Sequence, residues 1–326
     1  MTINNADFEK LLTPESIAYR NKQSVMTRIT KSIRRDFMLY LMLMPMIIWF
    51  LVFLYKPMTG LQLAFKQYSA WKGIEGSPWI GFDHFVTLFH SEQFLRAVRN
   101  TIVLSIYSLI LAFPVPIFLA LMINEVRSNN FRKSVQTILY LPHFISVVIV
   151  AGLVVTFLSP STGVINNILS LIGFDRIYFL TQPEWFRSIY ISSNIWKEAG
   201  FDSIIYLAAI MSINPALYES AQVDGASRLQ MITRITLPCI LPTIAVLLVI
   251  RLGNILEVGF EYIILLYQPT TFETADVIST YIYRLGLQGA RYDIATAAGI
   301  FNAVIALIVV LFANAMSRRI TRTGVF

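Results

Sequence analysis

Residues 214–228 read NPALYESAQVDGASR and are the most informative part of the sequence. Asn214 is a favourable helix cap, and Pro215 suits the first turn of a helix. Gly225 follows an aspartate and is typical of a turn, because glycine tolerates a positive φ angle. The pattern therefore predicts two short helices with a sharp bend between them, the second over about 226–235. Such a shape suits docking into the groove of a partner.

Long apolar runs lie on both sides of this stretch. A helix needs roughly 20 apolar residues to cross a bilayer, and several runs reach or approach that length. We therefore expect an all-α polytopic membrane protein with about six transmembrane helices. The expected helices cover residues 37–55, 101–124, 137–158, 188–213, 237–256 and 294–317. A shorter run, 164–174, is expected to lie at the membrane interface.

Composition agrees with a membrane protein. Of the 326 residues, 56% are hydrophobic and only 14% are charged, whereas soluble domains carry about 25% charged residues. The mean hydropathy is +0.63. These values exclude a disordered chain, a coiled coil and an ordinary soluble enzyme. With one cysteine and three scattered histidines, we expect neither an internal disulfide nor a metal site.

The distribution of basic residues predicts the orientation. Lys and Arg gather before the first apolar run, after the second and fourth runs, and after the last one. The positive-inside rule then places both termini in the cytoplasm. The expected organisation is a basic cytoplasmic N-terminal tail (1–36), a first transmembrane helix (37–55), an extracellular loop (56–100), a core membrane domain (101–317) containing the 214–238 loop, and a cytoplasmic C-terminal tail (318–326).

The 214–238 loop resembles a known motif. Residues 219–226 read Glu-Ser-Ala-x-x-Asp-Gly-Ala, and residues 235–238 read Ile-x-Leu-Pro. This order and spacing are similar to the EAA motif in permease subunits of binding-protein-dependent ABC importers, with Ser220 in place of the first alanine. The resemblance covers roughly residues 94–316 and the first transmembrane helix.

Other short stretches resemble the carbohydrate branch of these permeases. Asn100-Thr101 and Leu141-Pro142 fit the sugar importers, and the maltose-type first permease is the nearest type. Residues 253–261, GNILEVGFE, look like the polysaccharide permeases. The resemblance implies the type I ABC importer permease fold. It also implies a permease in the bacterial plasma membrane that moves an oligosaccharide or related glycan into the cytoplasm.

The resemblance further implies a set of partners. These are a second permease in a heterodimer, two ATPase subunits, an extracellular solute-binding lipoprotein, the sugar substrate and membrane lipid, with no nucleic acid. The chain has no P-loop motif, so we expect neither a catalytic residue nor a cofactor in it. ATP and Mg are expected in the ATPase subunits. The residues implied in ATPase coupling are Glu219, Ser220, Ala221, Asp224, Gly225, Ala226, Leu237 and Pro238.

Polar residues within the apolar runs indicate a substrate path, because charges at membrane depth are costly and face a cavity or a partner. Residues 254, 257 and 261 have the spacing of one helical face. Sugars need paired polar groups with aromatic faces beside them. The expected substrate-binding residues are Asn194, Trp196, Asn254, Glu257, Glu261, Tyr262 and Asn302.

Other interpretations remain open for these polar groups and for the whole chain. Lys197 and Glu198 could extend to the interface, and Arg251 could pair with a glutamate only to hold helices together. Glu257 and Glu261 could lie outside the membrane, past the end of the 237–256 run. The chain could be a permease for a non-sugar solute. A stand-alone secondary transporter would usually show an inverted repeat and no ATPase-docking loop, and a membrane enzyme would need a polar cluster that is not evident.

Overall fold

The computed structural model describes residues 34–321. These residues belong to two compact units, which meet between Leu61 and Gln62. Most of the predicted N-terminal tail and the end of the C-terminal tail lie outside the described residues. The first unit contains α4 (Phe37–Phe50), a π-helical turn (Leu51–Tyr55) and α5 (Lys56–Met58). No residue of these three elements is buried.

The first helix is longer than predicted. It runs on through a 3-10 segment (Thr59–Phe65), so that Phe37–Phe65 forms one helical stretch of 29 residues. Pro57 does not end it, because Pro57 lies at the start of α5, where a missing backbone N–H is tolerated. A helix that is apolar all round is typical of a membrane span or of a protein core.

Among the described residues, four helices are long and apolar enough to cross a membrane, and two bent helix pairs bring the number to as many as six. We number these segments as spans. Span one is Phe37–Phe65, span two Glu92–Glu125, span three Asn129–Phe144 with Val147–Phe157, span four Pro183–Met211 with Pro215–Val223, span five Arg228–Gly253, and span six Tyr292–Phe312.

The helices of spans two to six are as follows. Span two contains α8 (Glu92–Tyr107), a π-helical turn (Ser108–Ala112) and α9 (Pro114–Glu125). Span three contains α10 (Asn129–Tyr140), a 3-10 turn (Leu141–Phe144) and α11 (Val147–Phe157). Spans four and five contain α13 (Pro183–Met211), α14 (Pro215–Val223), α15 (Arg228–Met231), a π-helical turn (Ile232–Thr236) and α16 (Leu237–Gly253). Span six lies within α20 (Tyr292–Thr321).

Span three is not the straight helix predicted over 137–158. Its two halves meet at an angle of 100°. The first half ends in the 3-10 turn that contains Pro142, and Ser146 starts α11 by accepting a hydrogen bond from the Ile149 amide at 3.3 Å. A proline and a serine cap four residues apart therefore account for the bend.

The prediction of a second short helix in the 214–238 loop is also wrong in one respect. The chain does start a helix near residue 226, at Arg228, where Ser227 and Gln230 form a capping box. That helix does not stop at residue 235. It passes through the π-helical turn into α16, so the turn at Gly225 separates α14 from one continuous helix, Arg228–Gly253. Pro238 is tolerated because it lies in the first turn of α16.

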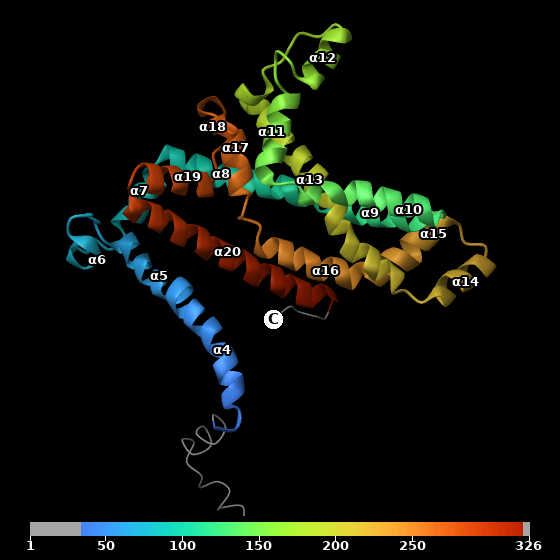
Figure 1. Cartoon of the computed structure of the whole chain (residues 1–326), viewed down its shortest axis with the longest axis horizontal. Coiled ribbons are helices and arrows are strands. Elements are labelled where there is room, and N and C mark those ends of the chain that lie inside the picture. The colour runs from blue at the N-terminus through green and yellow to red at the C-terminus, as the bar shows by residue number, and fades with distance from the viewer. Residues whose placement is uncertain (1–33, 322–326) are drawn as a thin grey trace, which may run out of the picture. The chain divides into compact units, whose positions relative to one another are not determined.

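Short helices fill the connections. They are α6 (Gly73–Gly76), α7 (Asp83–His90), α12 (Val164–Leu171), a 3-10 turn (Phe179–Thr181), α17 (Phe260–Leu266), a 3-10 turn (Pro269–Thr271), α18 (Phe272–Ala275), α19 (Ile278–Tyr283) and a π-helical turn (Arg284–Gln288). In the second unit, α17, α18 and α19 lie at one end of the long helices and α14 lies at the other end (Figure 1).

Packing in the second unit centres on α13. This helix packs extensively along α9 and also contacts α10 and α16, while α16 packs along α20. Gly200 allows the close approach of α13 to α10. A Cβ atom at Gly200 would lie 1.9 Å from the carbonyl oxygen of Leu139. No larger residue fits there without moving the backbone.

A buried polar network holds the α18–α19 segment to spans two and four. Asp276 is fully buried and accepts two hydrogen bonds from the Arg284 guanidinium, at 2.9 and 2.7 Å. The hydrogen bond that Arg284 donates to Asp276 raises the pKa of Arg284 above the usual arginine value. Asn100 on α8 donates to the carbonyls of Glu273 and Asp276, and Arg187 on α13 donates to Asn100. This end of the unit is therefore fixed by paired polar groups.

Candidate functional site

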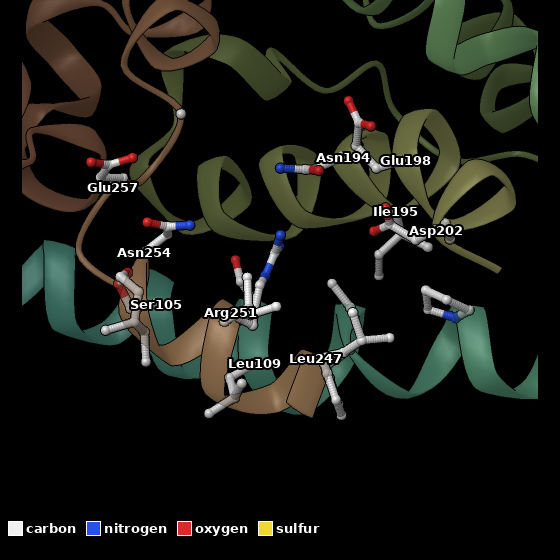
Figure 2. Close-up of a pocket in the computed structure, with 18 of the residues that line it drawn as sticks. Ser105, Leu109, Asn194, Ile195, Glu198, Asp202, Leu247, Arg251, Asn254 and Glu257 are labelled. Atoms are coloured by element: carbon white, nitrogen blue, oxygen red, sulfur yellow. The ribbon is translucent and has the colours of Figure 1, made fainter. Parts of the chain in front are cut away.

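A cavity of about 460 Å³ lies within the second unit. Span two, α13 and the end of α16 form its walls, together with the non-helical connection 254–259. Ser105 fixes one edge, because its hydroxyl donates to the carbonyl of Ile255 at 2.5 Å and so ties α8 to this connection. The cavity is polar along one side and apolar along the other, as Figure 2 shows for Asn194, Asp202, Leu109 and Leu247.

The polar side of the cavity comes mainly from α13. Five polar residues at intervals of four line it, namely Tyr190, Asn194, Glu198, Asp202 and Tyr206. Residues four apart lie on one face of a helix, so a single stripe of α13 faces the cavity. The spacing was visible in the sequence, but our prediction included only Asn194 of these five. Trp196 is off the stripe, half exposed and outside the cavity lining.

Span five supplies the opposite wall. The prediction that residues 254, 257 and 261 share one helical face is wrong, because α16 ends at Gly253 and α17 begins at Phe260. Asn254 and Glu257 still line the cavity, from the connection rather than from a helix.

The remaining predicted substrate residues lie outside the lining. Glu261 is exposed on α17. Tyr262 is buried and packs against Tyr190, with ring centroids 5.8 Å apart. Asn302 is half-buried on α20. A direct role in substrate binding remains a prediction for each residue of the predicted set.

The carboxylate of Glu198 has two basic neighbours. Lys197 forms an ion pair with it, and Nδ1 of His143 lies 2.6 Å from its second oxygen. The His143 ring stacks on Phe201, with centroids 3.9 Å apart and planes within 3°. His143 lies in the bend of span three. The cluster therefore connects this bend to α13 and offsets the charge of Glu198.

The predicted coupling residues gather at the α14 end. Asn214 caps α14 by accepting a hydrogen bond from the Ala216 amide at 3.0 Å, as predicted. Gly225 has a φ angle of +76°, and the Ala226 amide donates to the Ala221 carbonyl at 2.9 Å. This is a Schellman ending, in which a left-handed residue stops the helix.

The surface of this bend is open. The side chains of Glu219, Ser220 and Asp224 are exposed, as are those of the apolar residues Val223 and Leu229. Leu237 and Pro238 lie further along, at the start of α16.

A bundle of apolar spans around a polar cavity, with a structured bend at one end, defines a polytopic membrane transport protein. Residues 112–322 match the family described as binding-protein-dependent transport system inner membrane component. The chain belongs to this family. It has the type I ABC importer permease fold and is a transport subunit located in a membrane.

Solved structures agree with this assignment. One chain in the crystal structure of a bacterial ABC transporter involved in the import of the acidic polysaccharide alginate is 80% identical. It superimposes with a TM-score of 0.85 and covers 90% of this chain and 99% of its own length. A second structure is the bacterial alginate ABC transporter in complex with alginate pentasaccharide-bound periplasmic protein. One of its chains has the same identity and TM-score, and the match covers 91% of this chain and 100% of that chain.

A similar permease protein also supports the family assignment. The polygalacturonan/rhamnogalacturonan transport system permease protein YteP of Bacillus subtilis (strain 168) is 45% identical over 288 residues. The match covers 88% of this chain and 90% of the relative.

Proposed function

We propose that this chain is one permease of a heterodimeric ATP-driven importer for acidic oligosaccharides. A second permease, two ATPase subunits and an extracellular solute-binding protein complete the transporter. The single observation that carries the substrate class is the 80% identity to a chain of an importer of an acidic polysaccharide, over nearly the whole length of both chains. The polar stripe of α13 supports a glycan as the substrate, because hydroxyl-rich glycans need many hydrogen-bonding partners along a path.

The proposal places the α14 end, and with it both termini, in the cytoplasm. Positive charge in the corresponding loops supports this orientation. The exposed residues of the bend, including Glu219, Asp224 and the apolar Val223, would then dock on an ATPase subunit. Closure of the ATPase pair would move α14 and change the packing of the spans around the cavity. ATP and Mg bind to the ATPase subunits, and this chain requires no cofactor of its own.

The test is a reconstitution of the complete complex in proteoliposomes. ATP hydrolysis is measured with the solute-binding protein alone and with the solute-binding protein plus each member of a glycan panel. The panel contains uronic acid oligosaccharides, neutral oligosaccharides and glycerol phosphate. We expect stimulation by the uronic acid oligosaccharides above all others. Stimulation by neutral glycans or by glycerol phosphate alone would overturn the substrate class.

A further inference from the structure

Arg251 occupies an unusual place for a cation. It lies in the last turn of α16 and is the only charged residue of that helix. Figure 2 shows Arg251 extending from α16 toward the helix that carries Asn194, with Asn254 and Glu257 on one side and Asp202 on the other. A charged side chain within a membrane span is costly and faces a cavity or a partner. Attraction to the C-terminus of α16 offsets part of that cost.

The charges around the cavity are unbalanced. Glu198, Asp202 and Glu257 contribute three carboxylates to its lining, and Arg251 contributes the only cationic side chain of the lining. Glu198 is already paired with Lys197 and His143. Asp202 lines the same cavity beside Arg251 (Figure 2). In the described part of the chain, however, the Arg251 guanidinium joins none of the ion pairs.

This imbalance conflicts with an acidic substrate unless one group attracts it. Two like charges in a medium of low dielectric repel strongly, so the carboxylates of Asp202 and Glu257, which join none of the described ion pairs, would repel a uronic acid chain. A guanidinium without a fixed partner provides the necessary attraction. Its planar donors match both oxygens of a carboxylate, and its positive charge does not depend on pH.

We propose that Arg251 selects acidic glycans by binding a sugar carboxylate in the cavity. This inference rests on the proposed function and adds the residue that distinguishes charged from neutral glycans. Asp202 holds the guanidinium electrostatically while the cavity is empty, and the substrate carboxylate replaces that interaction. Asn194 and Asn254 flank the guanidinium and pair with neighbouring sugar hydroxyls. Glu257 is on the same wall as Arg251 and limits the site to one carboxylate at a time.

The test measures binding to the complete complex in nanodiscs, without the solute-binding protein. The probes are a uronic acid tetramer and the same tetramer with its carboxyls reduced to alcohols. We expect the wild-type complex to bind the acidic tetramer at least tenfold more tightly, with the preference falling as salt is added. In Arg251→Gln the two affinities become equal within about twofold. Arg251→Lys retains the charge but loses the planar donors, so its preference is intermediate.

Controls separate binding from folding. Arg127→Gln removes an exposed guanidinium in the loop after α9, outside the cavity lining, and retains the full preference. If the Arg251→Gln complex still binds the acidic tetramer more tightly than the reduced tetramer, the inference is overturned. If Arg251→Gln does not assemble, Arg251→Lys decides, because an undiminished preference there contradicts recognition by the guanidinium. A wild-type complex without preference overturns the inference but not ATP-driven glycan import, whereas a complex that moves no glycan overturns the proposed function itself.

Discussion

The phenolic oxygen of Tyr218 on α14 lies 2.8 Å from the hydroxyl oxygen of Thr236 at the base of span five. Thr236 is buried, with 2% of its surface exposed. Arg228, from the same region, makes a second contact: a guanidinium nitrogen of Arg228 lies 3.7 Å from a carboxylate oxygen of Glu125 at the end of α9. The helix α14 is therefore tied to span five, whose first residue contacts span two, and both spans line the cavity.

Removing the Tyr218 hydroxyl should weaken coupling. A typical hydrogen bond contributes about 0.5–1.5 kcal/mol, so Tyr218→Phe is expected to lower the amount of glycan moved per ATP by roughly two- to tenfold. Thr236→Val should have the same effect, and Thr236→Ser, which keeps the hydroxyl, should not. The measurement is the ratio of glycan uptake to ATP hydrolysis in proteoliposomes. An unchanged ratio in both Tyr218→Phe and Thr236→Val would mean that this hydrogen bond does not contribute to coupling.

Gly225 should be required for its backbone conformation. Its φ angle of +76° costs a residue with a Cβ atom roughly 1–2 kcal/mol. Gly225→Ala is therefore expected to weaken the binding of ATPase subunits to the permease pair, measured by co-purification. Gly299→Ala is the matched control, because a Cβ there meets nothing within 4 Å and its φ is not positive. Equal co-purification of both variants would argue against the role of the bend.

Gly200 should be sensitive to a single methyl group. Its absent Cβ would come within 1.9 Å of the Leu139 carbonyl oxygen, so Gly200→Ala must push α13 away from α10. We expect a clear loss of thermal stability and of transport. Gly152 in α11 has open space around it, and Gly152→Ala should be neutral or slightly stabilising because alanine favours helix. Comparable melting temperatures for the two variants would contradict the packing described.

The Asp276–Arg284 pair should matter for folding more than for transport chemistry. Removing one member of a buried pair costs about 3–5 kcal/mol, because the remaining charge is left without a partner. Asp276→Asn is expected to lower the thermal stability of the purified complex strongly. Asp175→Asn, on an exposed loop, should leave it unchanged. Full stability of Asp276→Asn would show that the α18–α19 segment is held by other contacts.

The sequence predicted best those features that depend only on neighbouring residues. Asn214 and Gly225 identified the cap and the bend, because capping and positive φ depend on a few neighbouring residues. The end of α16 was missed although Gly253 and Asn254 are typical of a helix C-terminus, since the apolar pattern continues through Ile255 and Leu256. The bend in span three was missed for the same reason: its residues are apolar on both sides of Pro142.

The cavity depended on information that the sequence does not contain. The stripe from Tyr190 to Tyr206 could have been recognised from its spacing of four. The approach of Arg251 to that stripe could not, because it depends on how α16 packs against α13. Likewise, Trp196 has the right chemistry for sugar contact but lies on another face of α13 than the cavity. Composition identified candidate residues, and only tertiary packing separated those that line the cavity from those that do not.

ATP-driven glycan import is tested most directly by uptake of a labelled uronic acid oligosaccharide into proteoliposomes that contain the complete complex, with the solute-binding protein outside and ATP inside. We predict accumulation with ATP, none with ADP, and none when Glu219→Lys or Gly225→Pro replaces the wild-type chain in an assembled complex. Accumulation by this chain in liposomes without the ATPase subunits would contradict the account and indicate a secondary carrier or a channel.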